Sequence, residues 1–158
     1  MAERGARKFL CVIDDTPECR VAVRFAARRA AHTLGHVALL YVMEPPDFRE
    51  WKAIEARMRE EAYKEAERAL YEAASLVNQV SAQRPELIIK EGLRRDQLVA
   101  LLKEDPSISI LVLGAGTTKS GPGPLVSSII AGEFGHAFSI PITLVPGGLT
   151  DAEIDALA

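Results

Sequence analysis

The sequence predicts an α/β domain built on one parallel sheet, with helices on both faces. Short apolar runs without polar alternation recur along the chain, as expected for strands that are buried on both faces. Helical patterns separate these runs and the links are short, which is typical of a parallel sheet. The 158 residues, of which 48% are apolar and 26% charged, fit a single soluble domain. We therefore expect one domain over residues 1–158, with a core of about 8–146 and a tail at 147–158.

The first unit is a strand, a helix and a second strand. The apolar run 9–13 predicts the first strand, and Thr16 and Pro17 after it are typical of a helix start. Apolar residues then recur at helical spacing until Gly35, which we expect to end the helix. A second apolar run, 37–43, predicts the next strand.

A long charged segment over about residues 49–82 predicts one amphipathic helix. Its apolar positions step by three and four along one stripe: Trp51, Ile54, Met58, Ala62, Ala66, Ala69, Ala73, Leu76 and Val80. We interpret this Ala-rich stripe as the face that lies on the sheet, and a coiled-coil interface with a partner is the alternative. The Glu, Lys and Arg residues between these positions then form a solvated outer face.

The second half of the chain continues the alternation of strand and helix. Strands are expected at about 86–90, 108–113 and 142–145, and helices at about 98–102 and 126–138. A loop rich in Gly and Pro, 114–124, joins the fourth strand to the second of these helices. For residues 147–158 we expect either one acidic turn or a flexible tail.

Composition argues against several classes of function. The net charge of −3 does not favour nucleic-acid binding, and basic pairs such as Arg94-Arg95 are interpreted as solvated helix faces rather than phosphate ligands. Two cysteines, Cys11 and Cys19, make no disulfide scaffold and favour a reducing compartment. No apolar run approaches the roughly 18 residues of a membrane span. We expect a cytoplasmic protein that binds neither nucleic acid nor membrane.

Three strand ends carry the residues that a ligand would meet, because ligands of parallel α/β sheets bind at the carboxyl ends of the strands, where the winding reverses. These residues are Ile13, Asp14 and Thr16 after the first strand, Val42 in the second, and Leu113 with the glycine-rich residues 114–118 in the fourth. The glycine-rich loop leads into a helix whose first turn we place near Ser127, Ser128 and Ile129. Exposed backbone N–H groups there would cradle a phosphate. A plain flexible loop capped by serine is the alternative, and these residues alone leave both open.

Six segments between residues 8 and 146 form a more specific pattern. They are Phe9–Asp14 with Thr16, Leu39–Pro45, Lys90–Gly92, Ile110–Gly114, His136-Ala137 and Ile140–Val145. In these segments the chain resembles the universal stress protein family. The resemblance implies a five-stranded parallel sheet with strand order 3-2-1-4-5, a homodimer that pairs through strand 141–146, and a further protein partner that the sequence does not name.

The resemblance also implies binding of ATP or AMP, with or without magnesium, through a Gly-x-x-Gly-x9-Gly-Ser motif. Carried onto this chain, the motif has Gly114 at its first position, then Thr117 and Ser127 where the family has glycine, and Ser128 as its serine. Because threonine resists the positive φ that glycine takes freely, we expect Thr117 to restrict the loop, with Gly116, Gly121 and Gly123 as compensations. The nucleotide-binding residues that the resemblance and the strand ends imply are Ile13, Asp14, Thr16, Val42, Gly92, Leu113, Gly114, Gly116, Thr117, Ser127, Ser128 and Ile129.

The resemblance assigns distinct parts of the nucleotide to two of these residues. It places Asp14 at the adenine or ribose and the Val42 backbone beside the base. Asp15 follows Asp14 directly, and its charge is expected to repel an anionic ligand. Lys119 is a candidate phosphate contact.

We assign no catalytic residue and no metal site. The three histidines are scattered, the Gly-x4-Gly-Lys-Ser/Thr loop of P-loop NTPases is absent, and Ser127-Ser128 lacks a Gly-x-Ser-x-Gly elbow. Asp14-Asp15 resembles the acidic pair of receiver domains, but the third and fifth strand ends lack the Asp and Lys that such domains need. The favoured function is a stress-response protein that couples nucleotide binding to partner interaction. A nucleotide-independent dimeric adaptor and slow ATP hydrolysis are the alternatives.

Overall fold

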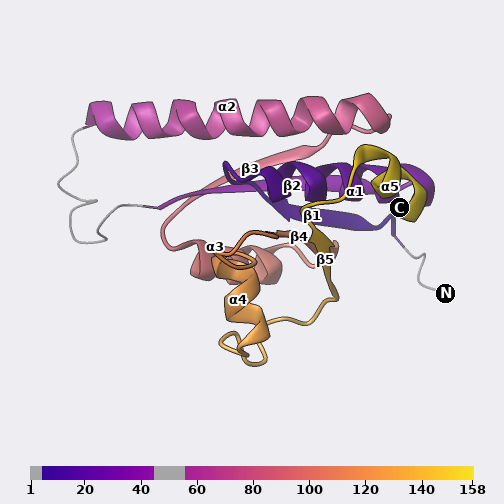
Figure 1. Cartoon of the computed structure of the whole chain (residues 1–158). Coiled ribbons are helices and arrows are strands. Elements are labelled where there is room, and N and C mark those ends of the chain that lie inside the picture. Colours follow the sequence, from indigo (N-terminus) through magenta and orange to yellow (C-terminus); the bar gives the residue numbers. More distant parts are fainter. Residues whose placement is uncertain (1–4, 45–55) are drawn as a thin grey trace.

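The chain folds into three layers around a five-stranded parallel sheet (Figure 1). The computed structural model describes residues 5–44 and 56–158. The strands stand in the order β3-β2-β1-β4-β5 and every pairing is parallel, so the predicted fold class and strand order are confirmed. In chain order the elements are β1 (Lys8–Val12), α1 (Pro17–Thr33), β2 (His36–Met43), α2 (Ala56–Val80), β3 (Glu86–Glu91), α3 (Arg94–Glu104), β4 (Ile108–Ala115), α4 (Pro124–Ile130), β5 (Ile142–Pro146) and α5 (Asp151–Leu157).

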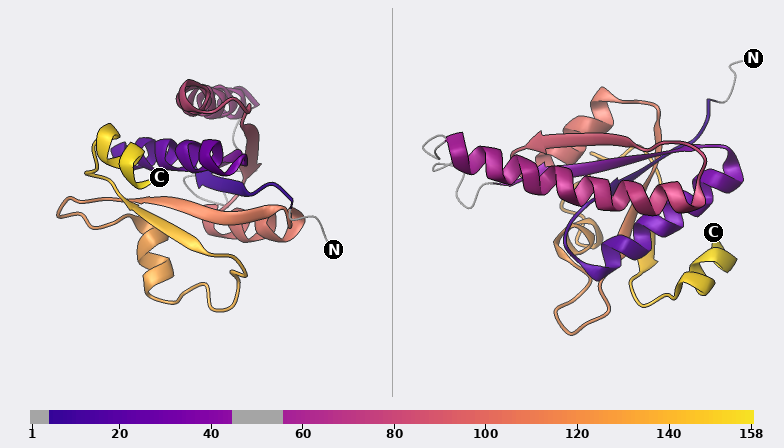
Figure 2. Two further views of the ribbon diagram at one scale, coloured as in Figure 1. Left: turned by 90° about the vertical axis from the view of Figure 1, so that its right-hand side faces the viewer. Right: turned by 90° about the horizontal axis from the view of Figure 1, so that it is seen from above.

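Helices cover both faces of the sheet (Figure 2). α1, α2 and α5 lie on one face, and α3 and α4 lie on the other. Side chains of a strand alternate between faces, so the central strand β1 contributes to two cores. Phe9 and Cys11 pack with α1 and α2, whereas Leu10 and Val12 pack with α3 and α4. Burial on both faces accounts for the continuous apolar runs in the sequence.

α1 ends close to the predicted position, but for a different reason. The left-handed residue that closes the helix is Leu34, with φ 54°, rather than Gly35. Glycine is needed at position 35 because the backbone of Arg7 lies very close to it: a Cβ there would lie 2.4 Å from the carbonyl oxygen of Arg7. The turn thus brings β2 directly alongside β1.

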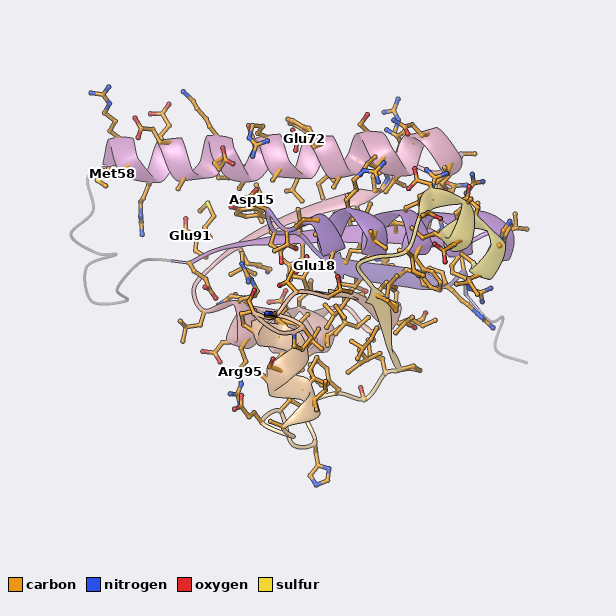
Figure 3. All side chains as sticks on the ribbon, in the orientation of Figure 1. Asp15, Glu18, Met58, Glu72, Glu91 and Arg95 are labelled. Atoms are coloured by element: carbon orange, nitrogen blue, oxygen red, sulfur yellow. The ribbon has the colours of Figure 1, made fainter. Side chains whose placement is uncertain are left out.

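α2 packs with its Ala-rich stripe toward the core on the α1 side of the sheet. Its buried residues are Ala66, Ala69, Leu70, Ala73 and Val77, and the last four pack in the same core as α1. Met58 was predicted in this stripe, but 56% of it is exposed, so the buried stripe begins further along the helix (Figure 3). The predicted stripe residues Trp51 and Ile54 lie outside the described residues.

α4 is much shorter than the predicted helix 126–138. It spans Pro124–Ile130, and turns follow in which Gly132 and Gly135 take φ values of 74° and 54°. Those left-handed glycines end the helix, although Phe134 and Phe138 still pack together with ring centroids 4.6 Å apart.

The last residues form a helix rather than a single turn or a flexible tail. Thr150 and Glu153 make a capping box at the start of α5, with each side chain bonded to the other residue's backbone N–H. Ile154 is 0% exposed in the core beside α1, and Arg24 and Arg28 both bind the carboxylate of Asp155. No helix in the described part of the chain is both long and apolar enough to cross a membrane.

Candidate functional site

A small pocket lies at the carboxyl ends of β1 and β4, between which the winding of the sheet reverses. We call it the switch-point pocket. Its volume is about 50 Å³, and the ends of β1 and β4, the starts of α1 and α3, and the residues leading into α4 all line it. Its lining residues are Val12, Asp14, Thr16, Glu18, Cys19, Arg94, Leu113, Gly114 and Pro122–Val126.

Four of the predicted nucleotide-binding residues meet in this pocket: Asp14, Thr16, Leu113 and Gly114. Ile13 instead lines a second cavity of about 250 Å³ between α1 and α2, which we call the α1–α2 cavity, and which Asp14 and Thr16 also line. The other predicted residues line neither space: Val42, Gly92, Gly116, Thr117, Ser127, Ser128 and Ile129. Of these, Val42 is buried within β2, and Gly92 is buried just after β3 with φ 135°.

Asp14 holds the loop between β1 and α1. Its Oδ1 accepts a hydrogen bond from the backbone N–H of Thr16 at 2.9 Å and another from the Thr16 hydroxyl. The Thr16 side chain makes no capping bond of its own to α1. Asp14 therefore positions the first turn of α1, and this turn forms one wall of the switch-point pocket.

The glycine-rich loop after β4 closes on itself. The N–H of Gly116 donates to the carbonyl of Pro122 at 3.0 Å, and the N–H of Gly121 donates to the carbonyl of Thr118 at 3.1 Å. Positive φ values occur at Gly121 and Gly123, not at Thr117. Thr117 therefore takes no left-handed conformation here, because Gly121 and Gly123, two of the expected compensating glycines, occupy the positions that need that region.

The helix after this loop starts earlier than predicted. Gly123 precedes the first turn of α4 and Pro124 occupies its first position. Ser127, where we placed the helix start, already donates its N–H to the Gly123 carbonyl at 2.9 Å. The N–H of Ser127 is thus used within α4, and Ser128 follows it inside the helix.

Glu18 is a pocket residue that the sequence reasoning missed. It lies in the first turn of α1 and is half-buried next to β4 and its loop (Figure 3). A Cβ on Gly114 would lie 2.1 Å from the carbonyl oxygen of Glu18, and a Cβ on Gly116 would lie 3.2 Å from its Oε1. Gly114, the first glycine of the motif, therefore makes room for α1, and the Glu18 carboxylate lies beside Gly116 in the loop.

Arg94 is the second pocket residue that was missed. We interpreted Arg94-Arg95 as a solvated helix face, which holds for the exposed Arg95 but is wrong for Arg94, which is half-buried and lines the switch-point pocket. Its Nε is buried and has no hydrogen-bond partner among the described residues. The strand-end rule, applied to the third strand, draws attention to the residues just after Gly92, but it does not tell Arg94 from Arg95.

The comparisons with known proteins match this architecture. The model of the universal stress protein family matches residues 5–146. The chain belongs to that family. No curated protein sequence matches it significantly.

Solved structures of other universal stress proteins share its fold. UspA from Lactobacillus plantarum superposes with a TM-score of 0.72 at 18% identity, covering 88% of this chain and 97% of that one. A universal stress protein in complex with cAMP gives 0.65 at 21% identity, covering 88% and 96%. The Archaeoglobus fulgidus universal stress protein in complex with dAMP gives 0.57 at 17% identity, also covering 88% and 96%.

The charge of Asp15 is partly offset in this universal stress protein. Its Oδ1 lies 3.7 Å from Nη2 of Arg68 on α2, and Arg68 also pairs with Glu65 and with Glu72 at 3.0 Å. Asp15 points toward α2, where it lines the α1–α2 cavity rather than the switch-point pocket (Figure 3). The expected repulsion between Asp15 and an anion in the switch-point pocket is accordingly weakened.

Neither thiol near the site is a nucleophile. Cys19 lines both spaces, and burial raises its pKa to about 12. Burial also raises the pKa of Cys11 well above its usual range. Both thiols therefore stay protonated at neutral pH, and the thiolate is the reactive form. Within residues 5–44 and 56–158, no three His, Cys, Asp or Glu side chains gather as a metal ion would require.

Proposed function

We propose that this universal stress protein binds an adenine nucleotide in the switch-point pocket and couples its occupancy to interaction with a protein partner in the cytoplasm. The observation that carries the proposal is the convergence of Asp14, Thr16, Leu113 and Gly114, four residues chosen from the sequence, on one pocket. The pocket lies where open α/β sheets bind ligands. Two structural neighbours, in complex with cAMP and with dAMP, support an adenine nucleotide as the ligand.

Binding requires the pocket to open. Its volume of about 50 Å³ is far below the roughly 300 Å³ or more of ordinary small-molecule sites. The loop between Gly116 and Pro122 is the segment whose movement would enlarge it, at the expense of the hydrogen bond between those two residues. We therefore expect weaker binding of AMP or ATP than a preformed site would give. Magnesium, where it takes part, would be bound mainly through the phosphates of the nucleotide.

The proposed role is binding rather than catalysis. Hydrolysis of ATP needs a positioned base or water-orienting residue. Asp14 already accepts two hydrogen bonds from Thr16, and the Cys19 thiol stays protonated. Slow hydrolysis would be detected as ADP release during the binding experiments.

Titration calorimetry with AMP and ATP tests the proposal. The Asp14→Ala variant removes the carboxylate that positions the first turn of α1, and we expect it to weaken binding by roughly tenfold. Asp151→Ala is a matched control, because this carboxylate lies on α5 and pairs with Arg20 and Arg24 away from the pocket. Heats equal to those of dilution for the wild-type protein, with AMP and with ATP, would refute nucleotide binding.

The small pocket favours a second candidate, a nucleotide-independent adaptor that works as a homodimer. β5 is the edge strand next to β4 in the sheet that the structure describes, and 40% of its Leu144 is exposed. An exposed strand edge is a template for pairing with another chain. We propose that two copies pair through residues 141–146, across a two-fold axis. A dimer that forms in the absence of any measurable nucleotide binding would favour this candidate.

A further inference from the structure

Arg94 lines the switch-point pocket with a guanidinium whose hydrogen-bonding capacity is not fully used. Its Nε is the one buried side-chain nitrogen or oxygen, among those the structure describes, that has no hydrogen-bond partner. A buried N–H without a hydrogen-bond acceptor is rare in folded proteins, and it is especially unfavourable in a charged group. A ligand that supplies an acceptor to this N–H would therefore be bound favourably.

No acid that the structure describes forms an ion pair with this guanidinium. Glu44 accepts a hydrogen bond from the backbone N–H of Arg94, not from its side chain. Asp14 and Glu18 line the same pocket, yet neither carboxylate lies within ion-pair distance of Arg94 in the described structure. The planar fork of an arginine is suited to bind two oxygens of one phosphate at once.

The glycine-rich loop beside the pocket is unsuited to an anion in this conformation. There the Gly116 N–H is bonded to Pro122, and the Glu18 carboxylate lies next to Gly116. A phosphate chain laid along this loop would meet the negative charge of Glu18 and would find that N–H occupied. Charge therefore favours an anion at the α3 side of the pocket and disfavours one at the loop.

We propose that Arg94 binds the phosphate of the nucleotide and makes the site selective for nucleoside monophosphates over triphosphates. This inference rests on the proposed nucleotide binding and goes beyond it by naming the residue and the number of phosphates. One guanidinium satisfies one phosphate, whereas the further phosphates of ATP extend toward Glu18.

Calorimetry with adenosine, AMP and ATP separates the parts of this proposal. In Arg94→Gln, AMP affinity falls by at least about tenfold, whereas adenosine affinity changes by less than about twofold. Glu18→Gln raises ATP affinity more than AMP affinity. Arg95→Gln is the matched control, because that neighbouring side chain is exposed, lies over the Phe134 ring and is outside the pocket; it leaves all three affinities unchanged.

Thermal unfolding provides an independent readout. Because its Nε makes no bond in the free protein, Arg94→Gln keeps the wild-type melting temperature, and AMP raises that temperature in the wild type only. Equal AMP affinities for Arg94→Gln and Arg95→Gln overturn the role of Arg94 and leave nucleotide binding intact. Equal losses of AMP and adenosine in Arg94→Gln also overturn it. A wild-type protein that binds none of the three ligands overturns both the proposed function and this inference.

Discussion

Replacing Ile154 with alanine is expected to unfold the protein at a clearly lower temperature. Ile154 is 0% exposed and lies in the core that α1 and the sheet share with α5. The substitution removes three buried carbon atoms, each contributing about 0.8 kcal/mol, and it leaves a cavity that adds to the loss. We expect the free energy of unfolding to fall by about 3 kcal/mol, which corresponds to a decrease of roughly 6–12 °C in Tm for a chain of this size.

Thermal and urea unfolding followed by circular dichroism measure this change. Leu157→Ala is the matched control, because the same helix carries this residue with 66% of it exposed. We expect that control to change stability by less than about 0.5 kcal/mol. If both variants lose the same small amount, α5 is not docked on α1 in solution and the burial argument is wrong. A change in the urea m-value would show that more than one side chain is affected.

Three further changes test separate parts of the structure. Gly114→Ala should destabilise the fold by about 1–3 kcal/mol, because its Cβ would lie 2.1 Å from the Glu18 carbonyl oxygen. Gly148→Ala is the control, because its Cβ would meet nothing closer than 3.9 Å, and it should leave the melting temperature in thermal unfolding unchanged. The hydrogen bond from Lys8 lowers the pKa of Asp105, so the stability contributed by Asp105 is present above about pH 4 and is lost as the pH falls through the lowered pKa. Acid titration of stability should therefore show the gap between wild type and Asp105→Asn closing below that pH; a constant gap would contradict the assignment. Leu144→Lys should convert the proposed dimer to a monomer in light scattering without lowering Tm, and an unchanged dimer would place the interface elsewhere.

Ile142, on the same strand, is a poorer site for that last test than Leu144. As part of the apolar run 141–146 it is an obvious target for a charge, but in the structure it packs against the core formed with α3 and α4. A lysine at Ile142 would disturb folding as well as pairing. The exposed Leu144 on the same strand separates the two effects.

Most of the fold could be predicted because local pattern and tertiary structure agree. The strands appear in the sequence as continuous apolar runs, and Thr16-Pro17 marks the start of α1. Helix ends were less predictable, since they depend on backbone conformations that tertiary contacts select. The run 126–138 retains apolar residues at helical spacing, yet Gly132 and Gly135 turn the chain out of the helix.

The candidate site could be predicted only where a strand end determines it. Asp14 lies two residues after β1 and Gly114 lies next to the last residue of β4, and the sheet brings them together. Glu18 and Arg94 enter the pocket from the first turns of helices, and their directions depend on how α1 and α3 pack. A charged residue in a first turn has the same local sequence signature whether it points to solvent or into a pocket, so sequence alone did not separate Arg94 from Arg95.

Opening of the switch-point pocket by a ligand is expected to affect the edge strand β5. The loop whose opening accompanies the proposed nucleotide binding begins at Gly116, directly after Ala115 at the end of β4. The Ala115 carbonyl accepts a hydrogen bond from the Gly147 N–H at 2.8 Å, which ties the start of this loop to the end of β5. Gly147 also approaches Glu18, whose Cβ would lie 2.7 Å from a Cβ on that glycine. A ligand that binds the open conformation of the loop more tightly than the closed one increases the population of the open conformation. The size of this shift is set by the difference between the two affinities. Because the same few residues join the loop, α1 and β5, we expect nucleotide binding to alter pairing through β5, and by linkage we expect pairing to alter nucleotide affinity by the same factor.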